Sequence, residues 1–198
     1  MTSKNIKSIN NLKKIVKSYP LVDDIILFGS VVRGKEKPAD TDILVIFQEK
    51  VDKNVEYLIR KELEKVYLNL SIVSKTKQTL MDPSFDARES FLFEGVSLLT
   101  KEKSAEDYGF SSYGLFKYDF KQWDKLKKTK FYYAFNGRAG SKGFSQQLGC
   151  IKLSDRIILV PLDKIEAMRT FLESWELPYN YVPTLIPQRL SKKELLEQ

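Results

Sequence analysis

The chain has 198 residues, of which 42% are apolar and 12% aromatic, so it can bury the core of one mid-sized domain or of two small ones. Its 33 basic and 26 acidic residues leave a formal charge of +7, which favours a polyanionic partner. The absence of histidine excludes imidazole bases, Ser-His and Cys-His nucleophile pairs and His-bearing zinc sites.

The first predicted elements are an amphipathic helix and two buried strands. Apolar residues at helical spacing predict a helix over residues 6–19, which Pro20 ends. Short continuous apolar runs at 25–28 and 43–47 are typical of strands that are covered on both faces. Between these strands lies a Gly-Ser turn, after which we expect a short helix.

A second helix and a third strand follow along the chain. Asp52 is a candidate N-cap for a helix with clear apolar periodicity. Residues 68–73 indicate a strand, and residues 87–94 indicate a helix that closes the domain. A charged, poorly periodic stretch over 101–107 marks a boundary, so we predict a first domain over residues 1–104.

The remaining residues, 105–198, predict a smaller α+β module. Aromatic residues at helical spacing between Phe116 and Leu126 predict a helix that continues toward Phe135. The elements expected after it are a flexible basic loop at 137–143, a strand at 156–160, a helix at 165–175, an extended segment from Pro178 and a short helix within 187–198.

Residues 28–45 contain a pattern that suits the binding of a metal and a nucleotide. The first strand breaks at Gly29 and Ser30, where bare backbone N–H groups and a hydroxyl can grip a triphosphate. Asp40 and Asp42 enter the second strand and project together, because successive side chains of a strand alternate between its faces. Paired carboxylates of this kind can hold hard divalent cations.

A Gly-Ser pair, a nine-residue spacer and Asp-x-Asp resemble the signature of the DNA polymerase β-type nucleotidyltransferase superfamily, and most closely its small stand-alone members, the minimal nucleotidyltransferases. A strand before each half, with Arg33 and Gly34 between them, makes the likeness more specific. The resemblance covers residues 1–104 and implies an α/β (α+β) fold, a mixed sheet with flanking helices. Residues 105–198 resemble no family that we can name.

The resemblance implies a metal-dependent enzyme that transfers a nucleoside monophosphate from an NTP to a hydroxyl and releases pyrophosphate. Asp40 and Asp42 would bind Mg²⁺ or Mn²⁺. Nucleotide-binding roles, at the phosphates and the leaving group, fall to Gly29, Ser30, Arg33 and Lys35. For the two cations, the alternative is an exposed loop position without phosphate contact.

Active members of the superfamily carry a third carboxylate on the next strand, and this chain departs from that pattern. Our alignment puts Asn69 at the position and Ser71 one pleat further along the same face, and neither side chain can act as a carboxylate base. Three explanations stay open: a naturally weakened site, a deliberate Asp-to-Asn change, or a substitute such as Asp82 or Asp86. The predicted catalytic residues are Asp40, Asp42 and Asn69, in an enzyme that Asn69 impairs.

Positive charge is concentrated in residues 121–142, which contain seven cations and the single acid Asp124. The aromatic segment 131–135 interleaves with them, a combination that can hold a nucleic-acid backbone and stack on unpaired bases. A solvated lysine face over an aromatic core is the alternative. The predicted nucleic-acid-binding residues are Lys125, Lys127, Lys128, Lys130, Arg138 and Lys142.

We therefore predict a nucleotidyltransferase whose second domain positions the acceptor, an RNA 3′ end in preference to a DNA 3′ end. Two alternatives stay open. In one, the acceptor is a hydroxyl on a partner protein, as in toxin–antitoxin pairs, and the basic module is a docking surface. In the other, the chain is a non-catalytic nucleic-acid-binding protein that retains the fold.

The single cysteine, Cys150, excludes an internal disulfide and suits a packing role. No stretch approaches the roughly 18 consecutive apolar residues of a membrane span, and the N-terminus is too polar for a signal peptide. We therefore expect a cytoplasmic protein without a membrane partner.

Overall fold

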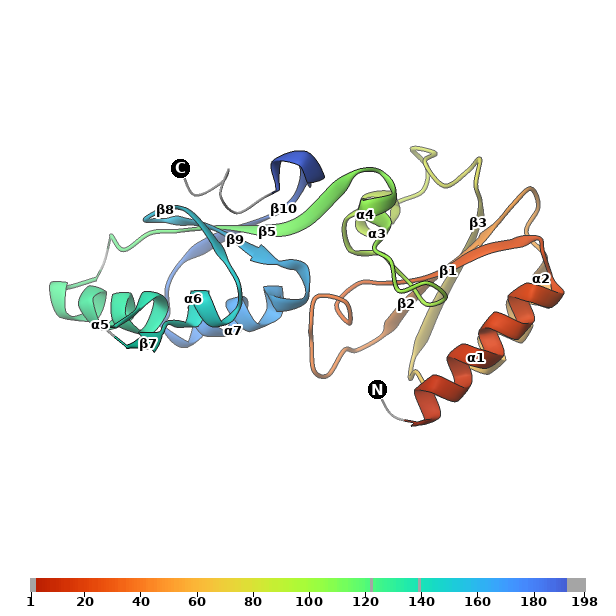
Figure 1. Ribbon diagram of the computed structural model, residues 1–198, viewed down its shortest axis with the longest axis horizontal. Coiled ribbons are helices and arrows are strands. Elements are labelled where there is room, and N and C mark those ends of the chain that lie inside the picture. The colour runs from red at the N-terminus through yellow and green to blue at the C-terminus, as the bar shows by residue number, and fades with distance from the viewer. Residues whose placement is uncertain (1–2, 122, 139, 192–198) are drawn as a thin grey trace. The chain divides into compact units, whose positions relative to one another are not determined.

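The computed structural model describes residues 3–121, 123–138 and 140–191. The chain forms two compact units, Met1–Tyr108 and Gly109–Gln198, each with a four-stranded sheet of its own (Figure 1). We predicted a division after residue 104. The contacts extend the first unit to Tyr108, because a short helix, α4 (Ser104–Asp107), packs against the helix before it.

The first unit contains a mixed sheet with the strand order β3-β2-β1-β4. Strand β2 pairs antiparallel with β1 and parallel with β3, and β4 pairs antiparallel with the other edge of β1. This arrangement confirms the predicted fold class. The strands are β1 (Val22–Phe28), β2 (Thr41–Phe47), β3 (Leu70–Thr76) and β4 (Val96–Ser97).

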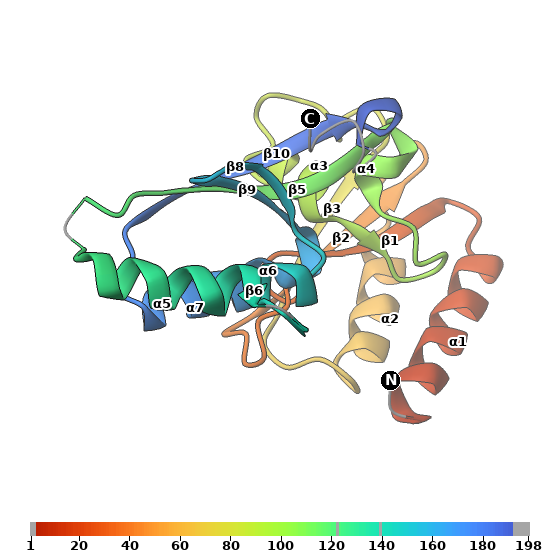
Figure 2. The same cartoon turned by 60° about the vertical axis from the view of Figure 1, so that its left-hand side comes forward.

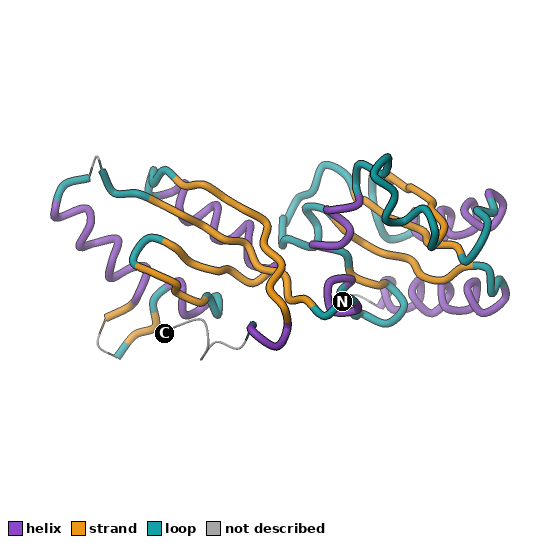
Figure 3. Tube along the Cα trace, turned by 90° about the horizontal axis from the view of Figure 1, so that it is seen from above, coloured by secondary structure: helices purple, strands orange, loops and turns teal. Residues whose placement is uncertain are grey.

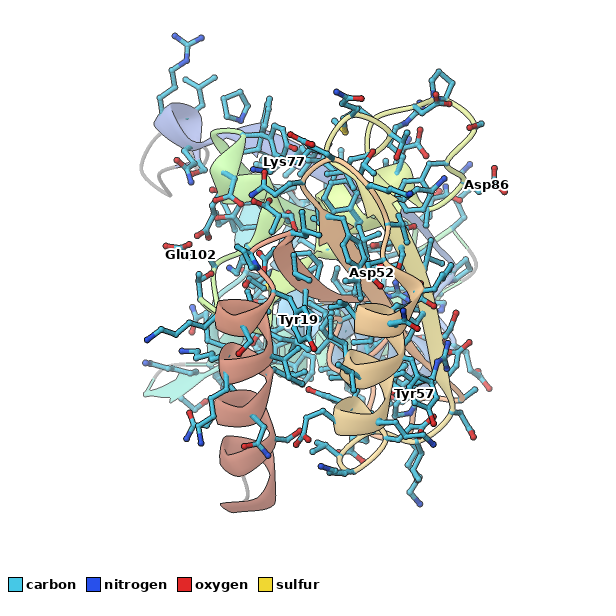
Figure 4. The ribbon with its side chains drawn as sticks, turned by 90° about the vertical axis from the view of Figure 1, so that its right-hand side faces the viewer. Tyr19, Asp52, Tyr57, Lys77, Asp86 and Glu102 are labelled. Atoms are coloured by element: carbon cyan, nitrogen blue, oxygen red, sulfur yellow. The ribbon has the colours of Figure 1, made fainter. Side chains whose placement is uncertain are left out.

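Helices α1 (Ser3–Ser18) and α2 (Lys53–Leu63) cover one face of this sheet and lie side by side (Figure 1). The Asp52 carboxylate accepts hydrogen bonds from the N–H groups of Asn54 and Val55, at 2.8 and 3.2 Å, so the predicted N-cap is confirmed. Figure 4 shows Asp52 at the start of α2. The core on this face contains Leu12, Ile25, Ile43, Val45, Phe47, Val55, Ile59 and Leu63.

Helix α3 (Arg88–Glu94) and the turns before it cover the opposite face. Figure 1 shows α3 on the other side of the strands from α1 and α2. The core here contains Ile26, Phe28, Leu44, Ile46, Leu80, Phe85 and Phe91. Because both faces are covered, β1 and β2 are the continuous apolar runs that the sequence shows.

Two details of the first unit differ from the sequence prediction. The expected short helix after Ser30 is a series of turns, in which the N–H groups of Val32 and Arg33 share the Gly29 carbonyl. The run ends at Gly34, whose φ of +90° leaves the right-handed helical region. The third strand begins at residue 70 instead of 68, after a residue that has a positive φ.

The second unit contains an antiparallel sheet with the strand order β10-β5-β9-β8, and its strands lie side by side in Figure 3. Helices α5, α6 and α7 lie on one face of it (Figure 2). The strands are β5 (Phe110–Tyr118), β8 (Ile151–Ser154), β9 (Ile157–Pro161) and β10 (Tyr179–Pro187), and the helices are α5 (Lys125–Asn136), α6 (Phe144–Gln147) and α7 (Ile165–Ser174). The predicted basic loop forms a small hairpin of β6 (Gly137–Arg138) and β7 (Ser141–Lys142).

The prediction of a helix that begins near Phe116 is wrong. Phe110–Tyr118 is a central strand, in which Phe116 pairs with Tyr181 on one side and with Ile158 on the other. The apolar residues in this stretch fit a helical period, but Phe116, Tyr118 and Phe120 also alternate with polar residues. A period of two is the pattern of a strand with one covered face. The helix itself starts at Lys125, after an Asp124 cap.

The remaining predictions for this unit are largely confirmed. The strand at 157–161, the helix at 165–174 and the extended segment from residue 179 are all present. A short 3-10 turn occupies Gln188–Leu190, and residues 192–198 of the predicted terminal helix lie outside the described residues. Cys150 is buried, and burial raises the pKa of its thiol to about 12, in agreement with a packing role.

Aromatic rings form the core of the second unit. Phe131 and Phe135 of α5 are each 1% exposed, and their ring centroids lie 5.1 Å apart. Both rings also contact Tyr118 of β5 and Phe171 of α7. These edge-on and stacked contacts attach the helices to the sheet.

Replacing Phe131 with Ala should therefore lower the free energy of unfolding of this unit by about 3–5 kcal/mol, since it leaves a cavity among fixed rings. Both tryptophans of the chain, Trp123 and Trp175, lie in this unit, so urea unfolding followed by tryptophan fluorescence reports on it. The neighbouring Tyr132→Ala is the control, because that ring is 55% exposed. Equal effects of the two changes would contradict the packing role of α5.

Candidate active site

The residues of the Asp-x-Asp pattern lie at the sheet edge where β1 ends and where β2 and β3 begin. In the observed register, Phe28 of β1 is opposite Asp42 of β2, and Asp42 is opposite Ser71 of β3. Asp40 lies just outside the start of β2. Antiparallel pairing on one side and parallel pairing on the other thus bring three chain segments together around Asp42.

Strand alternation decides on which face of the sheet this site opens. Ile43, Val45 and Phe47 point into the core beneath α1 and α2, whereas Leu44 and Ile46 point into the core beneath α3. The Asp42 side chain points to the same face as Leu44 and Ile46, because side chains two residues apart along a strand share a face. The site therefore opens on the α3 side of the sheet.

Gly29 approaches Asp42 so closely that no other residue fits without a shift. A methyl group at this position would stand 2.4 Å from Asp42 Oδ2, and the φ of +83° is one that side-chain-bearing residues rarely adopt. The glycine of the Gly-Ser pair is thus required by the carboxylate beside it. The position of the Asp42 carboxylate and the conformation of the Gly29 turn therefore depend on each other.

The environment of Asp42 disfavours its negative charge. Partial burial raises the pKa of the Asp42 carboxyl most strongly, and the neighbouring charge of Asp40 raises it further. A hydrogen bond from Ser71 and the positive charge of Arg33 act in the opposite direction, but the net pKa stays above the ordinary value. A cation bound beside the Asp40 and Asp42 carboxylates would relieve the unfavourable negative charge of Asp42.

Asn69 does not occupy the position that the sequence alignment gave it. Its φ is +51°, and its side-chain amide donates a hydrogen bond to the Ala39 carbonyl at 2.9 Å. Its own carbonyl accepts from the N–H of Thr41 at 3.0 Å. Asn69 therefore joins the segments that precede β2 and β3, and the β3 side chain that reaches Asp42 is that of Ser71.

Arg33 is held by an ion pair with a buried acid. Its Nη1 lies 2.5 Å from Oε2 of Glu94 in α3, and the Glu94 side chain is only 5% exposed. The sequence gave little reason to single out Glu94, although an acid beside Phe91 and Phe93 in a short apolar helix is a signal that a partner is needed. Arg33 thus connects the Gly-Ser turn to α3 as well as lowering the Asp42 pKa.

The other predicted nucleotide-binding residues belong to the same turn. Ser30 is half-buried, and its carbonyl accepts a hydrogen bond from the N–H of Lys35 at 3.1 Å. Lys35 itself is exposed. Its side chain can therefore reach an anion without losing a contact that the fold needs.

The candidate metal site is formed by the carboxylates of Asp40 and Asp42. Within the described ranges, no group of three or more His, Cys, Asp or Glu side chains is placed to hold a metal ion. Asp82 and Asp86 therefore do not complete a three-carboxylate group, and the Asp82 carboxylate instead accepts from the N–H of Ser84 at 2.8 Å. Asp40 and Asp42 nevertheless fit Mg²⁺, which proteins bind through one or two carboxylates together with water and substrate phosphates.

The predicted nucleic-acid-binding cations do not form one stripe. The Lys127 ammonium lies 4.5 Å from the Trp123 ring centroid and 3.5 Å from a Glu176 oxygen, and Arg138 lies over the ring of Tyr133. These two cations are partly engaged within the unit. The remaining predicted cations, Lys125, Lys128, Lys130 and Lys142, are exposed.

Residues 10–97 match the family described as polymerase beta, nucleotidyltransferase. Two solved structures resemble about half of the chain at 18% identity. One is a mutant of the toxin–antitoxin MntA–HpeT, with 50% of this chain and 79% of that chain covered and a TM-score of 0.36. The other is the tri-AMPylated Shewanella oneidensis HEPN toxin in complex with MNT antitoxin, with 52% and 78% covered and a TM-score of 0.34. These two likenesses do not bear on the activity of this chain.

A comparison with curated proteins gave no match. In the part of the chain that the structure describes, no helix is both long and apolar enough to cross a membrane.

Replacing Arg33 with Met should destabilise the first unit, because the change leaves the buried Glu94 carboxylate without its cation. The expected loss is about 2–4 kcal/mol, since Arg33 keeps about a quarter of its surface exposed and the pair is not fully desolvated. Thermal unfolding followed by far-ultraviolet circular dichroism measures it. Adding Glu94→Gln should recover part of the loss, and an unchanged melting temperature in Arg33→Met would show that the ion pair does not stabilise the fold.

Proposed function

Because residues 10–97 form a polymerase beta-type nucleotidyltransferase domain, we propose that the protein transfers a nucleoside monophosphate from an NTP to a hydroxyl acceptor. The observation that carries the proposal is the pair of carboxylates at Asp40 and Asp42, held beside the Gly29 turn at an open sheet edge. Oxygen ligands next to a phosphate-binding turn are what phosphoryl-group chemistry requires, because that chemistry depends on positioning and charge neutralisation.

The turn after β1 is suited to the triphosphate. The backbone at Gly29 is bare because the close approach of Asp42 excludes a side chain, so N–H groups and the Ser30 hydroxyl can approach phosphate oxygens. Lys35 would neutralise the leaving pyrophosphate, since its side chain is exposed at the end of the same turn. Arg33 contributes positive charge near Asp42 but is oriented by Glu94.

Asp40 and Asp42 would hold Mg²⁺ or Mn²⁺ together with the nucleotide phosphates. When bound, the ion supplies a positive charge that stabilises the phosphate oxygens and lowers the pKa of the attacking hydroxyl. Ser71 of β3 lies opposite Asp42, and its hydroxyl lowers the pKa of the Asp42 carboxyl. A neutral hydroxyl at this position adds neither a third negative ligand nor a base, so we infer a weaker site than three carboxylates would make.

In the proposed reaction, the acceptor oxygen forms a bond to the α-phosphorus while the bond from that phosphorus to the bridging oxygen of the β-phosphate breaks. Pyrophosphate leaves with the electron pair. The acceptor proton passes to a carboxylate or to water, because Ser71 cannot take it at neutral pH. Asp40 is exposed and Asp42 is partly buried, so we propose Asp40 as the carboxylate that an acceptor hydroxyl reaches more easily from solvent.

We propose an RNA 3′ end as the acceptor, on the strength of the net charge of +7 and of the cations gathered on α5. Incubation of the protein with Mg²⁺, each labelled NTP, and either purified RNA or cell lysate would identify the molecule that becomes labelled. Labelled RNA would support the proposed acceptor. Label on a protein band alone would replace it with a protein hydroxyl, and no label at all would favour a binding protein without catalysis.

Replacing Asp40 or Asp42 with Asn should abolish Mg²⁺-dependent NTP binding and leave the fold intact, because each change removes a negative ligand from a strand end without opening a cavity. Isothermal titration measures the binding, and a melting curve checks the fold. Glu49→Gln is the matched control, since Glu49 is an exposed acid beyond the opposite end of β2. Full NTP binding in either aspartate variant would contradict the assigned site.

Replacing Ser71 with Asp should raise transferase activity about 10²-fold or more, because it supplies a third carboxylate next to Asp42. Asn69→Asp is the paired control. It should not raise activity, since the Asn69 side chain is directed to the Ala39 carbonyl and an ionised Asp there only loses that hydrogen bond. Turnover of labelled NTP measures both, and a gain in the Asn69 variant alone would show that the register does not decide the catalytic position.

A further inference from the structure

The second unit contains a pocket that the nucleotidyl-transfer site does not use. It has a volume of about 340 Å³ and lies along one side of α5, between this helix, β5 and the β8–β9 hairpin. Figure 2 shows α5 below these strands. Its aromatic lining consists of Tyr118, Phe120, Phe131, Tyr132, Tyr133 and Phe135. A volume of this size is at the lower end of the roughly 300–1,000 Å³ typical of ligand sites, so it suits one small planar group.

The lining combines buried rings with two exposed rings. Phe131 and Phe135 are each 1% exposed, and the unit's aromatic core holds them in place. Tyr132 is 55% exposed and Tyr133 is 45% exposed, and their ring centroids lie 6.0 Å apart. The Tyr133 ring already contacts the Arg138 guanidinium at 5.2 Å, so Tyr132 is the better placed of the two to stack on a ligand. A rigid floor with an open aromatic wall can stack a planar ligand at small entropic cost.

Charge selects the kind of ligand. The pocket lining includes the ammonium groups of Lys128 and Lys152 and one acid, Asp155, whose carboxylate is paired with Lys152 at 2.8 Å. Residues 125, 128 and 132 lie on one side of α5, because they are three and seven positions apart. Lys125 therefore adds a further positive charge on the pocket side, and the charge here complements an anion.

The opposite side of α5 carries cations of a different kind. Lys127 and Lys130 lie on that side, each about 100° or more around the helix from Lys128. Lys127 contacts Trp123 and Glu176, and neither Lys127 nor Lys130 lines the pocket. The basic residues of the helix thus serve two separate surfaces, one of which faces the aromatic pocket.

We propose that this pocket holds one unstacked base of a single-stranded nucleic acid, stacked on Tyr132, with an adjoining backbone phosphate on Lys128. An aromatic wall for the base and ammonium groups for the backbone are the two features that single-strand recognition combines. The proposal deepens the acceptor assignment made above, and it rests on that assignment only in the choice of nucleic acid as ligand.

The test compares two RNA probes of equal length and charge. One is a fluorescein-labelled ten-nucleotide single-stranded RNA, and the other is the same backbone with its bases removed. Wild-type protein should bind the complete RNA about 5- to 150-fold more tightly than the abasic backbone, because base–aromatic stacking is worth about 1–3 kcal/mol. Equal affinity for the two probes in fluorescence anisotropy overturns the proposal and is the result expected if a protein segment is the natural occupant.

Variants locate the binding within the pocket. Tyr132→Ala should lose the preference for the complete RNA, and Tyr132→Phe should keep it, because the ring is what stacks. Lys128→Ala should weaken binding to both probes and flatten the dependence of log K on log salt by about 0.7. Lys130→Ala is the matched control on the far side of the same helix and should have a smaller effect. Wild-type preference in Tyr132→Ala, or equal effects of the two lysine changes, overturns the proposal.

The test is independent of catalysis. Asp42→Asn should bind both RNA probes as the wild type does, and Tyr132→Ala should bind Mg²⁺–NTP as the wild type does, because the residues belong to different units. Failure of RNA binding with intact NTP binding would remove the pocket assignment alone. Failure of NTP binding with an intact preference for the complete RNA would remove the proposed transferase and leave the pocket.

Discussion

The contact between Gly29 and Asp42 is the constraint on which the arrangement of the first unit depends. The Asp42 carboxylate lies so close to the Gly29 Cα that a methyl group added there would displace it, and the φ of +83° disfavours any side chain. This contact exists only if β1 and β2 pair in the observed register and if the chain turns away with a positive φ directly after β1. The parallel pairing of β3 then puts Ser71 beside the same carboxylate. Fold and candidate site are therefore fixed by the same backbone geometry.

Sequence reasoning predicted those elements whose local signals agree with one another. The two buried strands, the Asp52 cap and the helix from Ile165 each combine an apolar pattern with a suitable start or end signal. Sequence reasoning failed at β5, where the aromatic residues fit both a helical period and a strand period. Pairing with β10 on one side and with β9 on the other makes this segment a strand. Local spacing carries no information about which strands are available as partners.

The candidate site shows the same division between local and distant information. The positions of Gly29, Asp40 and Asp42 follow from one stretch of chain, so the pattern itself was enough to find them. Which β3 residue lies beside Asp42 depends on the register of the parallel pair β2–β3, whose strands are joined through α2. A shift of two residues in this register exchanges Asn69 for Ser71 on the same face. Glu94 is distant in sequence from Arg33, and only the packing of α3 brings them together.

The second unit begins and ends with neighbouring strands. Strand β5 opens it and β10 closes it, and the two pair along their whole length, so that Phe110 stands opposite Pro187. The entry and exit of this sheet are thus adjacent, an architecture that makes a domain a self-contained cassette. Because its two ends meet, this sheet keeps its own strand pairing whatever length of chain joins β5 from one side or β10 from the other.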